Sequence, residues 1–302
     1  MKAVVLDEYG GPEKLIYRES RQPDCGDDEV LVKGKATSVN PIDYKLRSGA
    51  AKSFRPLDFP AILGRDLSGE VIKVGRGVTG FEKGMRVMAL ANATYAEYTV
   101  AKADILALIP EALTFEQAAA LPLVTTTGAQ LIELAVKPTP GQTVLVTGAL
   151  GGVGRAAVHV AYKNGARVLA GVRASERNVA TKLEVDAVVA IDNDDEIEKL
   201  RGLDAIADTV GGQVVERLLK AIREGGVLGS VLGPPPGAKK YNFRVEAIMA
   251  KPDASRLSQL ADEAANGQFS IPIDRVLRLE QAAEAHRLVE AHEVKGKIVL
   301  VP

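Results

Sequence analysis

The chain has 302 residues and a mass of 32.0 kDa, and hydrophobic residues make up 46% of it, which is enough to bury substantial cores in two domains. Its formal net charge of −1 and pI of about 6.4 show no basic excess of the kind typical of proteins that bind nucleic acid or membranes, so we expect neither as a partner. Cys25 is the only cysteine, so an internal disulfide and a cysteine-based zinc site are both excluded by counting.

Short strands joined by Gly, Pro and Asp turns dominate the first hundred residues. We expect strands at residues 2–6, 29–36, 67–74, 86–89 and 95–100. Strands this closely spaced, with no long helix between them, predict an antiparallel and partly barrel-like β domain. The opening apolar run breaks at Asp7, which argues against a signal peptide, and we expect a cytoplasmic protein.

Residues 116–134 change to helix-forming residues with a helical apolar period. We expect Pro122 and the cluster at 125–128 to interrupt this helix. Because Pro122 and Gln130 fall inside the apolar run at 121–136, that run predicts a soluble helix and no membrane span.

Strands and helices alternate from residue 143 onward. We expect strands at 143–147, 167–172, 187–190, 203–207 and 226–231, with helices near 152–164, 175–183 and 213–222. This alternation is typical of an α/β domain with a doubly wound parallel sheet.

The last part of the chain follows a GPPP stretch at residues 233–236. It contains a helix near 254–266, a strand at 273–277, a helix near 281–289 and a final strand at 297–301. Because a final strand needs a sheet to join, we expect it to return to the first β domain. The predicted domains are residues 1–118 with 254–302, and residues 119–253.

The most informative stretch is residues 143–173, which predicts a strand, a glycine turn, a helix and a second strand in one βαβ unit. The glycines allow a tight turn and a close approach of the backbone to a pyrophosphate. The helix that follows directs its free N–H groups and the positive end of its dipole at the turn. We therefore predict a dinucleotide site formed by Gly148, Gly151, Gly152, Val153 and Gly154.

The end of the second strand indicates which dinucleotide binds. NAD-binding units usually carry Asp or Glu there, whereas this chain has Arg173, followed by Ser175 and Arg177. A guanidinium can pair with a 2′-phosphate, which a carboxylate would repel. We predict NADPH as the cofactor, with Arg173 and Ser175 at the phosphate; the alternative is that Arg173 is only a solvated strand end.

Several segments together resemble the medium-chain dehydrogenase/reductase superfamily and, within it, the zinc-free quinone and enone reductases. They are SVNPIDYKLRSG (38–49), LGRDLSGEVIKVGRGVTGFEKGMRV (63–87), YAEY (95–98), the glycine turn, DTVGG (208–212) and GKIVL (296–300). The resemblance implies a GroES-like β domain built from both ends of the chain, a Rossmann domain, NADPH across the domain cleft, and a homodimer.

Departures from the zinc alcohol dehydrogenase branch are informative. That branch has a zinc-binding cysteine near the position of Asn40 and a His-Glu pair where this chain has Arg65 and Asp66. Without zinc as a Lewis acid, alcohol oxidation by the usual route is disfavoured. The resemblance then implies an enzyme without a metal that transfers hydride from NADPH to quinones or α,β-unsaturated carbonyls.

The resemblance also implies catalytic residues. Asn40 matches the family's cofactor-cleft asparagine. Five residues later many family members have a tyrosine, whereas this chain has Lys45, with Tyr44 one place earlier. Lys45 is either a cationic donor to the nicotinamide ribose or enolate oxygen, or a solvated surface lysine, and Tyr44 is expected in the cleft wall. Arg65 either faces the substrate or forms a structural bridge with Asp66 or Asp43.

Further cofactor contacts are expected from the second domain. Thr127 matches a threonine of the family that bonds the cofactor, although it also suits a helix N-terminal cap. Gly211 and Val231 fall at the ends of later strands, where dinucleotide contacts occur in such sheets. For Asp208, a structural role and a cofactor contact are equally consistent with its position.

The substrate and partners are less defined. The loops at 50–57 and 89–94 are short and mildly apolar, which indicates a small hydrophobic carbonyl or quinone substrate. Two alternatives are an enoyl-thioester reductase and a non-catalytic NADPH-binding or sensor protein. An edge strand near 226–232 is the expected contact of the homodimer.

Overall fold

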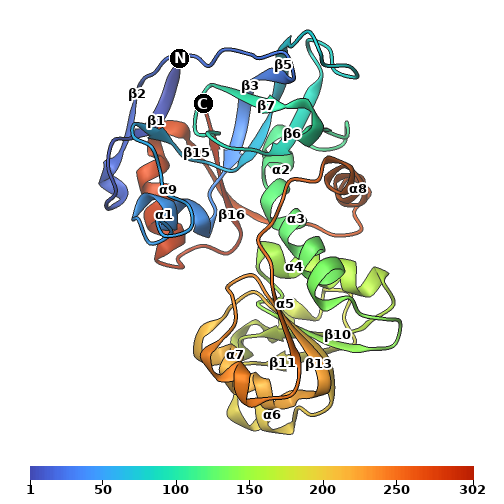
Figure 1. Ribbon diagram of the computed structural model, residues 1–302. Helices are drawn as coiled ribbons and strands as arrows, with labels where there is room; N and C mark the ends of the chain where they lie inside the picture. Colours follow the sequence, from blue (N-terminus) through green and yellow to red (C-terminus); the bar gives the residue numbers. More distant parts are fainter. The chain divides into compact units, whose positions relative to one another are not determined.

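The computed structural model describes all residues, 1–302, and consists of two compact units (Figure 1). The first unit comprises Met1–Leu123 and Pro252–Pro302, and the second comprises Val124–Lys251. No helix combines the length and the apolar character that a membrane crossing requires.

The first unit is built on two β-sheets. One has the strand order β15-β16-β3-β5-β6-β8, with β7 also paired to β3, and the other has the order β2-β1-β4. The strands are β1 (Lys2–Leu6), β2 (Leu15–Glu19), β3 (Glu29–Ser38), β4 (Ala61–Ile62), β5 (Asp66–Val74), β6 (Arg86–Leu90), β7 (Tyr98–Lys102), β8 (Ala107–Leu108), β15 (Ile273–Arg278) and β16 (Lys297–Val301). All pairings except β15–β16 are antiparallel.

The two ends of the chain share the first unit. The last strand, β16, pairs antiparallel with β3, so that Val299 lies opposite Ser38. The expected return of the C-terminus to the first β domain is therefore confirmed, and Figure 1 shows it as red ribbon beside blue.

Four helices complete the first unit: α1 (Pro41–Arg47), α2 (Phe115–Ala119), α8 (Ala254–Ala265) and α9 (Ala282–Glu290). Alanine and leucine recur on α9 at the spacing of one helical face, and Ala282, Ala285 and Leu288 are buried. They share a core cluster with Leu46 of α1, and the two helices lie side by side (Figure 1).

The second unit has a six-stranded, wholly parallel sheet in the order β11-β10-β9-β12-β13-β14. Its elements are α3 (Pro122–Gln130, begun in the first unit), β9 (Thr143–Thr147), α4 (Gly152–Lys163), β10 (Arg167–Val172), α5 (Arg177–Ala180), β11 (Ala187–Ala190), α6 (Asp194–Lys199), β12 (Leu203–Asp208), α7 (Gly212–Leu218), β13 (Ile222–Ser230) and β14 (Arg244–Ala247).

Both faces of this sheet are covered. Leu228 of β13 packs in one cluster with Ile197 of α6 and Val215 of α7. The next residue, Gly229, faces the opposite side and lies against the π-helical segment Leu131–Val136. The predicted doubly wound sheet is confirmed, and its strand order is that of dinucleotide-binding sheets.

The helix around Pro122 differs from its prediction. The cluster at 125–128 does not interrupt it, because α3 runs through the cluster and continues into the π-helical segment. Gly128 instead serves helix packing: a Cβ there would lie 2.7 Å from the Val153 carbonyl oxygen, so only glycine lets α3 approach α4 this closely. The strand expected at 95–100 begins only at Tyr98.

The predicted edge strand near 226–232 is wrong. That segment is β13, which lies inside the sheet between β12 and β14. The short strand β14, in the polar stretch after the prolines, pairs parallel with β13 and forms the edge. The prediction also missed β2, β4, β8, α1 and α6, whose short sequences carry little periodicity.

Candidate functional site

The glycine turn joins β9 to α4 in the second unit. Gly151 is the N-cap of α4, and no side chain caps the first turn of this helix. A Cβ at Gly154 would lie 2.1 Å from the Gly148 carbonyl oxygen, so glycine is required for this close packing of turn and helix. Uncapped N–H groups at the start of a twelve-residue helix suit a diphosphate. The turn therefore fits the expected dinucleotide.

Arg173 follows the last residue of β10. Because β9 and β10 are parallel, their carboxyl ends share one sheet edge with the glycine turn. The Arg173 side chain is 69% exposed, and its nearest carboxylate is that of Glu176 at 3.8 Å. Ser175 is exposed beside it, whereas Arg177 is held by Glu196 at 2.5 Å and by the Val188 carbonyl oxygen. Arg173 and Ser175 are thus the residues that fit a 2′-phosphate.

Asp208 is fully buried where β12 ends. Its Oδ1 accepts hydrogen bonds from Thr147 Oγ1 at 2.9 Å and from the Gly211 N–H at 2.9 Å, and its Oδ2 accepts one from Ser230 Oγ at 2.9 Å. Its carbonyl oxygen accepts the Val231 N–H at 3.2 Å. The carboxylate thus ties the ends of β9, β12 and β13 together, and the structural role left open for Asp208 is the one its contacts support.

Thr127 lies in the middle of α3 and is 8% exposed. The alternative of a helix N-terminal cap is therefore wrong, because the helix begins at Pro122. Of the two roles predicted for Thr127, only the cofactor contact therefore remains.

A buried polar network surrounds Asn40 in the first unit. The Asn40 amide Nδ2 donates to Asp66 Oδ2 at 2.7 Å and to the Ser38 carbonyl oxygen at 3.3 Å, and Oδ1 accepts from Lys297 Nζ at 2.5 Å. Asp66 also accepts from Ser38 Oγ and from the Leu123 N–H at 2.7 Å. Both hydrogens of the Asn40 amide therefore point into the protein.

Lys297 supplies the positive charge of this network. It is buried, and Nζ lies 3.0 Å from the Val39 carbonyl oxygen and 3.5 Å from Asp66 Oδ2. Burial lowers the pKa of Lys297, and the charges of Asp66 and Asp43 act in the opposite direction. Lys297 lies in the GKIVL segment, one of the segments that resemble the family. The sequence did not show which carboxylate pairs with it.

A second buried chain of contacts starts at Asp43 of α1. Its Oδ2 accepts the Asn40 N–H at 2.8 Å and the Tyr95 hydroxyl at 3.1 Å, and that hydroxyl lies 3.1 Å from His286 Nε2. Arg47 Nη1 faces His286 Nδ1 at 3.4 Å. Because arginine can only donate, Nδ1 accepts and Nε2–H donates to Tyr95.

The pKa values of Asp43 and His286 are shifted in opposite directions. Burial is the main reason that the pKa of Asp43 rises from 3.8 to about 7, with a smaller contribution from Asp66; Asn40, Lys297 and Tyr95 oppose the rise. Burial, followed by the charge of Arg47, lowers the pKa of His286 from 6.5 to about 3. At pH 6 the folded protein thus holds Asp43 protonated and His286 neutral.

These two shifts predict opposing effects of pH on stability. Between pH 3.8 and 7 folded Asp43 keeps a proton that the unfolded chain releases, so its contribution to the free energy of unfolding falls as pH rises. Between pH 3 and 6.5 unfolded His286 holds the extra proton, so its contribution rises with pH. Over pH 4.5–6 each contribution changes by about 1.4 kcal/mol per pH unit, and the two cancel.

Single variants should reveal each contribution. Relative to the wild type, Asp43→Asn should gain stability as pH rises from 4.5 to 6, and His286→Gln should lose it, each by about 1.4 kcal/mol per pH unit. Urea unfolding at pH 4.5, 5.25 and 6 measures this. Parallel pH dependences of wild type and variants would contradict the assigned protonation states, whatever the absolute loss of stability.

Lys45 and Tyr44 lie on α1, and both are half-buried. The Lys45 ammonium forms no hydrogen bond or ion pair within the chain, so it is available to a ligand. Burial, followed by the charge of Glu290, raises the pKa of Tyr44, which keeps its hydroxyl protonated at neutral pH. The side chain of Asn40, by contrast, lies wholly inside.

Arg65 directly precedes β5 and is almost fully buried. Its Nη1 donates to Asn92 Oδ1, and no carboxylate lies within 4.0 Å of its guanidinium. The predicted alternative of a structural bridge to Asp66 or Asp43 is therefore wrong. Asp66 pairs instead with Lys297, because Lys297 and Asn40 approach that carboxylate from β16 and from the start of α1.

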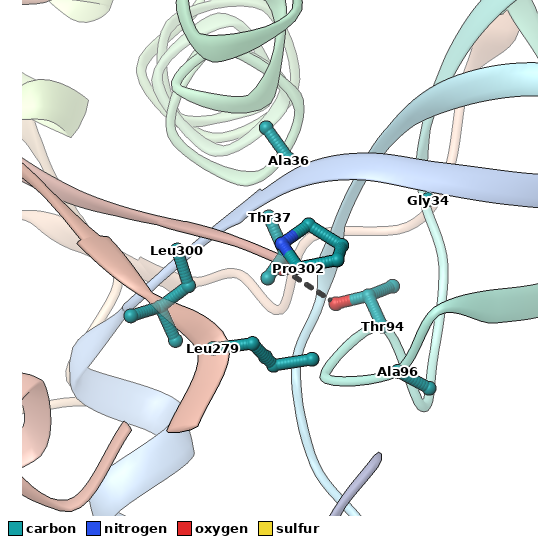
Figure 2. Close-up of a pocket in the computed structure, with 8 residues that line it drawn as sticks. All are labelled: Gly34, Ala36, Thr37, Thr94, Ala96, Leu279, Leu300 and Pro302. Carbon is teal, nitrogen blue, oxygen red and sulfur yellow. Dashed lines mark hydrogen bonds between the residues drawn. The ribbon is translucent and has the colours of Figure 1, made fainter. Parts of the chain in front are cut away.

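A narrow pocket also occurs in the first unit (Figure 2). Thr37 and Thr94 meet there through a hydrogen bond of 2.8 Å between their hydroxyls, and Leu279, Leu300 and Pro302 line it. The pocket is too narrow for a quinone or an enone.

Sequence reasoning missed most of the residues that form these polar contacts. They are Ser38, Asp43 as a titrating group, Arg47, Arg55, Asn92, Tyr95, His286, Glu290 and Lys297. Polar residues inside the matched segments were the one available signal. Their hydrogen-bond partners come from distant parts of the chain, so the sequence could not show which residue contacts which.

Comparisons with known proteins agree with this architecture. Residues 26–111 match the alcohol dehydrogenase GroES-like domain, and residues 183–300 match the zinc-binding dehydrogenase family. The chloroplastic NADPH-dependent alkenal/one oxidoreductase of Arabidopsis thaliana is 31% identical, in a match that covers 100% of this chain and 80% of the relative.

Two solved structures are similar over nearly their full length. The quinone oxidoreductase from Coxiella burnetii is 30% identical, with a TM-score of 0.90 over 100% of this chain and 99% of that chain. The Escherichia coli quinone oxidoreductase complexed with NADPH is 27% identical, with a TM-score of 0.88 and 100% of both chains covered. The chain belongs to the quinone and enone oxidoreductases of the medium-chain dehydrogenase/reductase superfamily, with a GroES-like domain and a Rossmann domain.

Proposed function

We propose that the protein is an NADPH-dependent, zinc-independent reductase of quinones or α,β-unsaturated carbonyls. The observation that carries this proposal is the uncapped glycine turn of α4, which shares a sheet edge with the exposed Arg173. The full-length similarity to an alkenal/one oxidoreductase and to quinone oxidoreductases supports the substrate class. Zinc independence is supported by Arg65, whose guanidinium cannot ligate a metal and repels a cation.

The overall reaction is a two-electron reduction. When bound, NADPH supplies a hydride, which adds to the β carbon of an enone, while a proton adds to the α carbon and the C=C bond becomes single. For a quinone, the hydride and one proton give the neutral hydroquinone. Charge that develops on the carbonyl oxygen needs a hydrogen-bond donor.

The residues of α1 can supply such a donor. In this proposal, the unpaired ammonium of Lys45 donates a hydrogen bond to the ribose of NADPH or to the enolate oxygen. Asn40 acts indirectly, because its amide is bound to Asp66 and Lys297 and thereby fixes the start of the helix that carries Lys45. Tyr44 contributes packing. Thr127, Gly211 and Val231 remain proposed cofactor contacts.

The test is NADPH oxidation followed at 340 nm with a panel of quinones, enones and enals. We expect turnover of at least one substrate class, unaffected by EDTA, and a fall of roughly 10-fold or more in kcat/KM for Lys45→Met, the loss of one charge-assisted hydrogen bond. Lys52→Met, an exposed lysine beyond α1, is the matched control.

Other outcomes separate the alternatives. Reduction of crotonyl-CoA in preference to the whole panel would favour an enoyl-thioester reductase. Tight NADPH binding without oxidation of NADPH by any acceptor would favour a non-catalytic cofactor-binding protein.

The proposal also retains a homodimer, now through the edge strand β14. Sedimentation of the wild type and of the Val245→Lys variant is the test of this contact.

A further inference from the structure

Two arginine side chains of the first unit converge on one uncharged oxygen. Arg65 donates from Nη1 to Asn92 Oδ1, and Arg55 donates from Nη2 to the same oxygen at 2.6 Å. Arg65 is 7% exposed and Arg55 is half-buried. Neither guanidinium lies within 4.0 Å of a carboxylate. Two positive charges therefore share a single neutral acceptor.

Arg47 is a second buried arginine of this unit, and its charge is compensated by a carboxylate. It is 2% exposed, and it donates to Glu290 Oε2 at 2.7 Å and to the Gly10 carbonyl oxygen at 3.0 Å. Removing a guanidinium from water is costly unless an anion and further acceptors replace the water. Arg65 is nearly as buried as Arg47 but has no anion beside it.

The surroundings leave this cluster positive. Burial and the neighbouring charge of Arg55 lower the pKa of Arg65 to about 10, while Asp43 and Asp66 oppose the shift from beyond salt-bridge distance. A pKa of about 10 still keeps the guanidinium charged at neutral pH. An anionic oxygen beside the two arginines would lower their mutual repulsion and supply the missing acceptor.

We propose that Arg65, Arg55 and Asn92 form a binding site for a carboxylate of the substrate, an assignment that rests on the proposed reductase function. The planar guanidinium matches a carboxylate in a two-pronged arrangement, and a second guanidinium adds charge without changing that preference. Arg55 and Asn92 belong to the loops at 50–57 and 89–94. The proposal adds an acid group to the small hydrophobic enone or quinone that these loops predict.

A pair of substrates that differ in one charge tests this site. Trans-4-oxopent-2-enoate and its methyl ester share the same reactive double bond. We expect the wild type to reduce the acid with a higher kcat/KM than the ester. In Arg65→Gln and in Arg55→Gln the ratio of acid to ester should fall by roughly 10- to 100-fold, the range for one charge-assisted hydrogen bond.

Two further variants guard against misfolding and unspecific charge effects. Asn92→Asp places a carboxylate between the two arginines, so it should lower the ratio while keeping the fold. Arg21→Gln, an exposed arginine paired with Asp24 on the same unit, should leave the ratio unchanged. Equal losses for acid and ester in the Arg65 variant would overturn the proposal, because the arginine would then serve the carbonyl oxygen common to both.

Binding of the saturated product tests the site without turnover. We expect calorimetry with 4-oxopentanoate to show saturable binding to the wild type, with and without NADP+, and at least 10-fold weaker binding of its methyl ester. Arg65→Gln and Asn92→Asp should remove this difference. Equal binding of acid and ester by the wild type would refute the carboxylate site, whereas carboxylate binding without NADPH turnover of any acceptor would refute only the proposed reductase function.

Discussion

Lys297→Met is expected to lower the free energy of unfolding by about 3–5 kcal/mol at pH 7, because it leaves a buried carboxylate without its cation. The ammonium of Lys297 makes three contacts, to the Val39 carbonyl oxygen, Asn40 Oδ1 and Asp66 Oδ2. Methionine has a similar shape but no donor, so the loss is electrostatic and not one of volume. Urea unfolding followed by circular dichroism measures it.

Two matched variants show whether the pairing is responsible. Lys295→Met removes an exposed lysine two residues away and should change stability by no more than about 0.5 kcal/mol. Lys297→Met combined with Asp66→Asn removes both charges and should recover at least half of the loss. A double variant that is less stable than Lys297→Met alone would show that Asp66 does not need the lysine.

Recovery of stability also separates folding from catalysis. Asn40 loses its Lys297 contact in both variants, so the start of α1 stays altered. If Asn40 positions Lys45 as proposed, kcat/KM should remain low in the double variant although stability returns. Full recovery of both stability and kcat/KM in the double variant would mean that contacts with Ser38 and residue 66 alone orient the amide of Asn40 properly.

Arg173→Asp is expected to reverse cofactor preference. It replaces an exposed cation at the end of β10 with an anion, which repels a 2′-phosphate and can accept hydrogen bonds from ribose hydroxyls. The ratio of kcat/KM for NADPH to that for NADH should fall about 100-fold or more, since a charge-assisted hydrogen bond is lost and a like charge is gained.

Arg173 also has a competitor within the chain. Glu176 lies 3.8 Å from its guanidinium, and the same glutamate accepts the Arg173 backbone N–H at 3.2 Å. Glu176→Gln should therefore leave NADPH binding intact or improve it. Arg201→Asp, an exposed arginine elsewhere in the second unit, is the control for unspecific charge effects. Equal losses with NADPH and NADH in Arg173→Asp would remove the assignment.

Catalytic and structural roles were the hardest to separate from the sequence. The motif around Asn40 predicted a cleft residue, yet its amide hydrogens are directed to Ser38 and Asp66. For Arg65 the sequence left two roles open, a contact with the substrate or a salt bridge to Asp66. The structure rules out the salt bridge, because Asp66 pairs with Lys297. In both cases the residue type was informative, but its role depended on partners far away in the chain.

The local sequence was sufficient for the dinucleotide-binding unit. A strand, a glycine turn, a helix and a second strand follow one another directly, so their periodicity and their glycines specify β9, α4 and β10 without reference to other segments. Arg173 was identified in the same way, since its position depends only on where β10 ends. Short elements such as β14 and α6 lack such a signal, and the sheet edge was misplaced as a result.

Long-range packing decided the polar interior of the first unit. Asp66 and Lys297 are separated by 231 residues, and Tyr95 and His286 by 191. No local pattern encodes such pairs, because a buried charge accepts whichever partner the folded chain delivers to it. The βαβ unit therefore indicated the cofactor, whereas the carboxylate site at Arg65 and Arg55 emerged only when two loops and β5 came together in the fold.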